Sequence, residues 1–137
     1  MDVVLIIGRV LFAAIFINSG IAHITKTQAL AGYATYKKVP MAKLAVIVSG
    51  LMILVGGLYI AFGVYADLGA LLIAIFLVPT AFKMHAFWKE SDATSKQSER
   101  MHFLKDISLA GAALVIFALV GAGANFGPSI TGTFFNF

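Results

Sequence analysis

The segment from Pro79 to Trp88 holds a lysine, a histidine and a tryptophan at the end of a long apolar run. Lys83 and His85 can donate hydrogen bonds to a carbonyl or phosphate oxygen, and Trp88 is typical of a residue that anchors a helix at a membrane interface. Pro79 removes a backbone donor and frees the carbonyl of Ile75, which predicts a kink. The segment therefore predicts a polar binding site at one end of an apolar helix.

All three histidines fall near the same end of the apolar runs, because His23 ends the first run, His85 ends the third and His102 begins the fourth. Two facing histidines could hold a haem and three could hold a metal. No cysteine or carboxylate is expected beside them, so we expect neither a haem nor a metal. A positively charged rim is the preferred interpretation, formed by Lys83, His85, His102 and Lys105. Such a rim could bind a lipid phosphate, the carbonyl of a quinone or an acidic face of a partner protein.

Arg9 lies inside the first apolar run, where a guanidinium is costly unless it snorkels, pairs or lines a polar cavity. One interpretation has Arg9 snorkelling to the interface and pairing with Asp67. The other has it contacting an anion or a lipid headgroup within the helices.

The composition excludes an ordinary soluble domain, since 61% of the residues are hydrophobic and 12% are charged. Charged residues alone make up about 25% of a typical soluble chain. The chain is therefore expected to be an integral membrane protein in contact with lipid, with residues 1–137 forming a single transmembrane domain. It has no cysteine, which excludes disulfides and cysteine-ligated metal centres. The placement of its basic residues favours a membrane and not a nucleic acid.

Four apolar runs predict an all-α, four-helix membrane bundle with helices at about 3–24, 42–62, 68–88 and 101–124. The alternative, that the first run is a cleavable signal peptide, is disfavoured by Arg9 and by the lack of small residues after His23. The polar segments 25–41 and 89–100 are read as connections, and the tail 125–137 is expected to lie at the interface.

Lysine and arginine gather at the first and third connections, and no lysine lies on the opposite side. The positive-inside rule then places both basic connections in the cytoplasm and both termini outside it.

Four segments carry a family resemblance: GRVLFAAIFINSGIAHI (8–24), GLMILVGGLYIAFG (50–63), FLVPTAFKMHAFW (76–88) and MHFLKDISLAGAAL (101–114). Together they resemble the DoxX family over nearly the whole chain. The resemblance implies a small four-helix protein of a bacterial or archaeal cytoplasmic membrane. The family takes its name from a membrane subunit of a thiosulfate:quinone oxidoreductase, and other members are associated with a membrane redox complex containing a superoxide dismutase and a sulfurtransferase.

Two positions depart from the family pattern. Ile53 stands where members often have a glutamate before the Gly-Gly pair, and Asp106 stands where an asparagine commonly follows the lysine. Loss of the glutamate weakens the case for a proton-coupled role.

The preferred function is a membrane subunit or anchor of a redox complex that contributes to a quinone or lipid-headgroup site, with other membrane or peripheral subunits as partners. The polar contacts would come from six residues: Arg9, Lys83, His85, Trp88, His102 and Lys105. The alternative is a structural accessory subunit, in which bulk at Gly56 or Gly111 would disrupt association. A transporter is a third hypothesis, and it is disfavoured because no inverted repeat is visible in the sequence. No catalytic residue is assigned, because no nucleophile with a base, metal motif or nucleotide loop is present.

Overall fold

The computed structural model describes residues 1–137 as an all-helical chain without strands. The four long helices are α1 (Asp2–Thr25), α3 (Ala42–Phe62), α4 (Ala66–Met84) and α5 (Ala93–Gly121). A short helix α2 (Thr27–Tyr36) follows α1, and a 3-10 turn η1 (Phe87–Lys89) follows α4. The predicted fold class is confirmed, and the second predicted helix has both of its bounds confirmed.

Two of the polar connections differ from the prediction. Residues 27–36, read as a connection, form α2, and α5 begins at Ala93 although residues 89–100 were read as a loop. The Asp92 carboxylate starts α5 by accepting a hydrogen bond from the Ser95 amide at 2.8 Å, which is a standard helix N-cap. The third predicted membrane helix, which is α4, ends at Met84, so Trp88 lies in η1 and not in the long helix.

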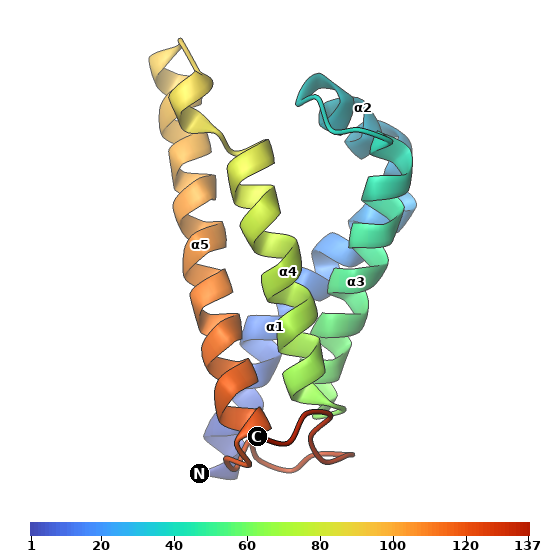
Figure 1. Ribbon diagram of the computed structural model, residues 1–137, viewed down its shortest axis with the longest axis vertical. Coiled ribbons are helices and arrows are strands. Elements are labelled where there is room, and N and C mark those ends of the chain that lie inside the picture. Colours follow the sequence, from blue (N-terminus) through green and yellow to red (C-terminus); the bar gives the residue numbers. More distant parts are fainter.

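The long helices pack in the spatial order α1, α3, α4, α5. Figure 1 shows α4 and α5 side by side as one arm, while α2 and the beginning of α3 diverge from them at one end. Helix α1 runs behind α4, and both chain termini lie at the opposite end. We call these the α2 end and the tail end. Buried side chains from all four long helices form the core, among them Phe16, Ile53, Ile73 and Ala113.

Glycines allow the helices to approach closely. A Cβ on Gly50 of α3 would lie 2.4 Å from the Cβ of His23 on α1, and a Cβ on Gly56 would lie 2.8 Å from the Gly69 carbonyl oxygen of α4. Small residues at such positions are the usual means by which membrane helices pack. Gly56 therefore packs against α4 within the protein, whereas a Cβ on Gly111 would meet nothing within 4 Å.

The four long segments are each apolar enough to cross a membrane. Only 22–33% of each apolar window is buried inside the protein, so most of the apolar side chains point outward. Water cannot solvate that much apolar surface favourably, and lipid can. The chain is therefore a multi-pass membrane protein whose helices contact lipid.

The tail segment, residues 125–137, folds back over the tail end and is fixed by hydrogen bonds to the helices. Arg9 Nη1 donates to the carbonyls of Phe126 at 3.0 Å and Pro128 at 2.9 Å. The Asp67 carboxylate accepts from the Phe134 amide at 2.9 Å and from the Phe135 amide at 2.7 Å. The predicted Arg9–Asp67 ion pair is thus wrong, because each side chain satisfies main-chain groups of the tail instead.

Candidate functional site

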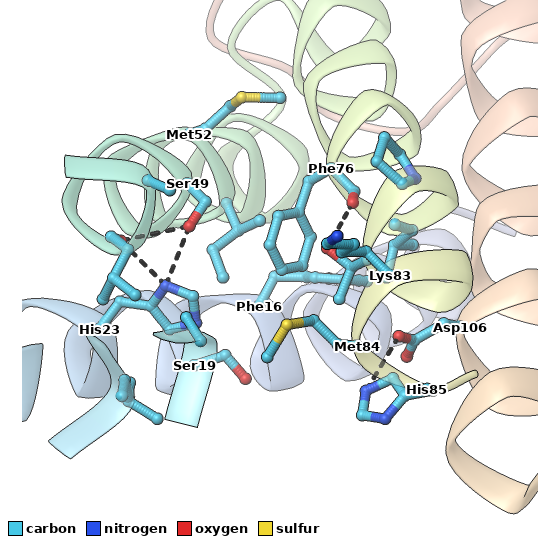
Figure 2. Close-up of a pocket in the computed structure, with 18 of the residues that line it drawn as sticks. Phe16, Ser19, His23, Ser49, Met52, Phe76, Lys83, Met84, His85 and Asp106 are labelled. Carbon is cyan, nitrogen blue, oxygen red and sulfur yellow. Dashed lines mark hydrogen bonds and ion pairs between the residues drawn. The ribbon is translucent and has the colours of Figure 1, made fainter. Parts of the chain in front are cut away.

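A cavity of about 520 Å³ lies between the diverging arms, toward the α2 end. All five α-helices contribute to its wall, and Figure 2 shows the side chains around it. Its apolar wall includes Phe16, Leu30, Met52, Ile53, Phe76 and Leu77, and its polar groups include Ser19, His23, Ser49, Thr80, Lys83, His85, Lys105 and Asp106.

The apolar wall is continuous with the lipid-facing surface. Val48 and Ile75 line the cavity, yet they are 52% and 53% exposed. Because the outward surface of these helices faces lipid, a hydrophobic molecule dissolved in the membrane could reach the cavity from the side.

His23 and Ser49 form the polar group on the α1 and α3 side of the cavity (Figure 2). His23 Nδ1 lies 3.0 Å from the Val46 carbonyl oxygen and 3.2 Å from Ser49 Oγ. A carbonyl oxygen can only accept, so Nδ1 must carry the proton. In the neutral ring Nε2 is then an acceptor, and it has no hydrogen-bond partner within the chain.

Lys83, His85, Lys105 and Asp106 form the polar group on the α4 and α5 side. Lys83 makes no ion pair or hydrogen bond, whereas Lys105 Nζ lies 3.5 Å from Asp106 Oδ1. Thr80, one residue after Pro79, donates to the Phe76 carbonyl at 2.7 Å. The α4 and α5 side of the cavity therefore offers both a free ammonium group and an ion-paired carboxylate.

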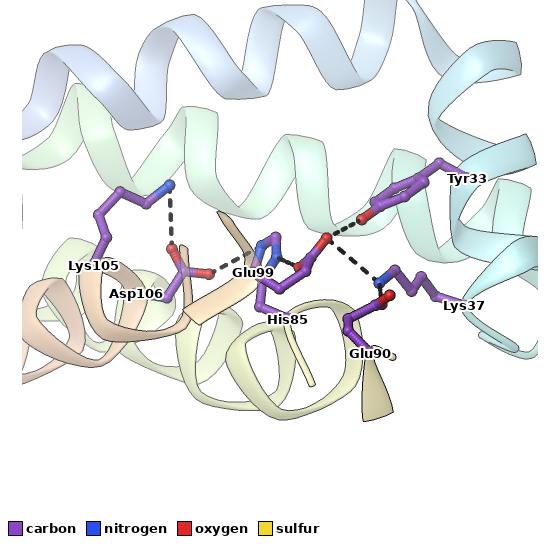
Figure 3. A network of polar contacts seen from close by, with 7 residues as sticks. All are labelled: Tyr33, Lys37, His85, Glu90, Glu99, Lys105 and Asp106. Carbon is purple, nitrogen blue, oxygen red and sulfur yellow. Dashed lines mark hydrogen bonds and ion pairs between the residues drawn. The ribbon is translucent and has the colours of Figure 1, made fainter. Parts of the chain in front are cut away.

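His85 also belongs to a polar network that links the α2 region to the segment between α4 and α5, and to α5 itself, beside the cavity (Figure 3). His85 Nδ1 lies 2.7 Å from Glu99 Oε2, and His85 Nε2 lies 3.6 Å from Asp106 Oδ2. Tyr33 donates to Glu99 Oε1 at 3.1 Å, and Lys37 Nζ lies 3.3 Å from Glu90. The expectation that no carboxylate lies beside a histidine is therefore wrong for His85.

The two α2-side groups of this network have shifted pKa values. Burial raises the pKa of the Tyr33 hydroxyl above its usual value near 10, and the negative charge of Glu99 raises it further. Burial alone would lower the pKa of the Lys37 ammonium, but its contacts with Tyr33, Glu90 and Glu99 raise it overall. Both shifts favour the protonated forms that hold α2 to α5.

Three of the six predicted site residues line the cavity, namely Lys83, His85 and Lys105. His102 stacks on His85 with ring centroids 5.1 Å apart but does not line the cavity. Trp88 packs against Phe103, with their ring centroids 5.7 Å apart. Arg9 lies at the tail end with the tail segment, so it is not brought together with the other five.

The sequence-based set omitted His23, Glu99 and Asp106, which the structure places in or beside the cavity. The position of His23 near the same end as His85 was a usable signal. Nothing in the spacing shows that Glu99 and Asp106 would both face His85, since that depends on how α4 packs against α5.

The cavity thus combines polar groups that can donate or accept hydrogen bonds with an apolar wall. The fold and the cavity together define a small all-helical, multi-pass membrane protein with a lipid-accessible site. The sequence profile of the DoxX family matches residues 4–86, which run from α1 to just beyond the end of α4. The chain belongs to the DoxX family. Neither the curated proteins nor the solved structures contain a significant match.

Proposed function

We propose that the protein binds a quinone in this cavity and serves as the membrane subunit of a redox complex. The observation that carries the proposal is a lipid-accessible apolar cavity with polar groups on two sides, His23 on one and Lys83 on the other. Binding sites for small membrane-soluble molecules are mostly apolar, with a few polar groups that fix orientation.

The available groups match the chemistry of a quinone and its quinol. A quinone carbonyl accepts hydrogen bonds, and the Lys83 ammonium is a donor that no group of the chain uses. A quinol hydroxyl donates, and Nε2 of the His23 ring, which has no partner within the chain, can accept when it carries no proton. The isoprenoid part of the molecule would lie along the outward-facing Val48 and Ile75 side of the cavity.

The redox-complex part of the proposal rests on the family to which the chain belongs. The DoxX resemblance implies association with quinone-linked oxidoreductases, and the chain lacks cysteine for an iron–sulfur centre of its own. A partner subunit would supply the electrons, while this chain would supply the position and electrostatics of the quinone. A bacterial or archaeal cytoplasmic membrane is the location that this proposal requires.

The test is to purify the protein from its native membrane in mild detergent and to identify the lipids extracted from it by mass spectrometry. We expect about one quinone per chain in the wild type and its loss in Ala45→Phe, which fills the cavity from α3. Ala112→Phe is the matched control, because Ala112 is exposed on α5 and does not line the cavity. A folded wild type that carries no quinone, and binds none when one is added, would overturn the proposal.

An anionic phospholipid is the second candidate ligand, favoured by the unpaired Lys83 ammonium. Its phosphate would contact Lys83, and its acyl chains would occupy the same apolar wall. Recovery of one phospholipid per chain, retained in Ala112→Phe and lost in both Ala45→Phe and Lys83→Met, would favour this candidate over the quinone.

A further inference from the structure

His85 lies between two carboxylates of one helix. Glu99 and Asp106 are seven residues apart on α5, so they lie two turns apart on the same face. The Glu99 carboxylate contacts Nδ1 of the His85 ring at 2.7 Å, and Asp106 is nearest to Nε2 at 3.6 Å. Figure 3 shows the ring between the two acidic side chains.

The positions of the protons on this group follow from hydrogen-bond chemistry. When both carboxylates are ionised they can only accept, so the Nδ1–H of His85 donates to Glu99 at the short distance. At 3.6 Å the contact between Nε2 and Asp106 is too long for a hydrogen bond, and it can become one when a proton is added between the two atoms. That proton resides either on the ring, as an imidazolium beside a carboxylate, or on Asp106 as a neutral acid.

The two carboxylates lie in different surroundings. Glu99 contacts Tyr33 and Lys37 of the α2 region, beside the polar beginning of α5. Asp106 lines the cavity, where its side chain is 6% exposed and is paired with Lys105. His85 therefore connects a carboxylate near the aqueous side with a carboxylate at the ligand cavity.

We propose that Glu99, His85 and Asp106 form a proton path between the α2 end and the cavity. The proposal rests on the proposed quinone site and names how its protons are supplied. The Nε2 to Asp106 distance must shorten by about 0.7 Å to reach a normal hydrogen bond, which a small side-chain rotation can provide.

The proton balance of the path is simple. Reduction of a quinone to a quinol consumes two electrons, given by a reduced electron-transfer protein, and two protons. For each proton, Glu99 in its acid form protonates Nδ1 while the Nε2 proton passes to Asp106, and Asp106 then protonates a quinone oxygen. The His85 side chain is 17% exposed, so exchange of ring protons with solvent would restore the starting tautomer between transfers.

Asp106 also changes the meaning of the family departure at Ile53. Ile53 lines the same cavity, but an isoleucine offers no carboxylate there. Asp106, the acid that the chain has in place of the family's common asparagine, lines the cavity from α5. A proton-coupled role thus has a carboxylate available on α5.

The experiment uses detergent-solubilised full-length protein carrying a bound short-chain ubiquinone. Carbon dioxide radical anions, made from formate by pulse radiolysis, supply the two electrons and are oxidised to carbon dioxide. Proton uptake from the solvent is followed with a pH-sensitive dye, and quinol formation is followed by its ultraviolet absorbance. Quinone affinity is measured separately for each variant.

We expect His85→Gly, compared with the wild type at saturating quinone, to slow proton uptake about tenfold or more, and added imidazole to restore the rate. Glu99→Gln should slow it similarly. Glu90→Gln is the matched control, because Glu90 also pairs with Lys37 but contacts neither His85 nor Asp106.

The outcomes separate the two proposals. Unchanged proton uptake in both His85→Gly and Glu99→Gln, with quinone bound, would overturn the proton path and leave the quinone site standing. Absence of quinone binding to the wild type would overturn the site and the path together. If His85→Gly fails to fold, Asp106→Asn is the deciding variant, since it keeps the side-chain shape and removes the acid.

Discussion

Arg9 and Asp67 are both buried at the tail end and carry opposite charges, yet each binds the tail segment and not the other. The Arg9 guanidinium takes main-chain carbonyls, and the Asp67 carboxylate takes main-chain amides. Ala61 adds a carbonyl to Arg9 at 3.2 Å. The tail segment therefore supplies hydrogen-bond partners to both charged groups, which burial at the tail end would otherwise leave unpaired.

Replacing Asp67 by leucine should release the tail. The change leaves the amides of Phe134 and Phe135 without their acceptor, and a hydrogen bond to a charged group contributes about 1.5–3 kcal/mol. We expect a lower unfolding temperature in detergent and faster chymotrypsin cleavage after the tail phenylalanines.

Asp2→Asn is the control for that variant, because Asp2 is an exposed acid at the beginning of α1. It should leave the cleavage rate near that of the wild type. Equal cleavage of the wild type and Asp67→Leu would show that the carboxylate does not hold the tail.

Gly50→Ala should weaken the packing of α1 on α3. The added methyl would lie 2.4 Å from the His23 Cβ, so the helices must separate, and overpacking of this kind costs about 1–3 kcal/mol. The displaced ring should also lose its hydrogen bond to the Val46 carbonyl. Gly111→Ala is the matched control, because nothing lies within 4 Å of its added methyl.

Unfolding by titration with sodium dodecyl sulfate measures both glycine variants. We expect only Gly50→Ala to unfold at a lower detergent fraction. A comparable loss of stability in Gly111→Ala would mean that the face of α5 around Gly111 packs against protein, as the accessory-subunit alternative requires.

The membrane-spanning helices could be predicted from the sequence because their signal is local. The run 42–62 is apolar throughout and is followed by Gly63, whose φ of +65° ends the helix in the left-handed conformation that glycine favours. Helix α2 was not predicted because it is only ten residues long and mixed in polarity. Its packing against α3 stabilises it in the folded protein. The polar beginning of α5 had a readable N-cap in Asp92.

The site was only partly predictable because it is made by contacts between helices. Lys83 and His85 were found from their position at the end of an apolar run. The partners of His85 were not, since Glu99 lies in a segment read as a loop and Asp106 was noted only as a family departure. Charge and hydropathy indicate which end of a helix is polar, but they do not indicate which side chains face each other.

Tyr33 should ionise at a higher pH than an ordinary tyrosine. Its pKa is raised by burial and by Glu99, so between pH 10 and its own pKa the unfolded state releases a proton that the folded state keeps. The stability contribution is therefore complete below pH 10 and is lost as the pH rises through the folded-state pKa.

The difference in ultraviolet absorbance between the wild type and Tyr33→Phe isolates this one group among the four tyrosines. We expect a tyrosinate transition above pH 10, shifted downward in Glu99→Gln because the nearby negative charge is gone. A transition at or below pH 10 in the otherwise unchanged protein would contradict the contact between Tyr33 and Glu99.

The proposed orientation predicts that the two ends of the molecule react with reagents on opposite sides of the membrane. The chain has no native cysteine, so single-cysteine variants report without background. Ser98→Cys lies on the exposed polar part of α5, and Asn136→Cys lies on the exposed tail. In intact cells a membrane-impermeant maleimide should label Asn136→Cys, and Ser98→Cys should react only after lysis, because the lysines and arginine around Ser98 favour the cytoplasm. The reverse pattern would invert the orientation and place the Glu99 end of the proton path outside the cell.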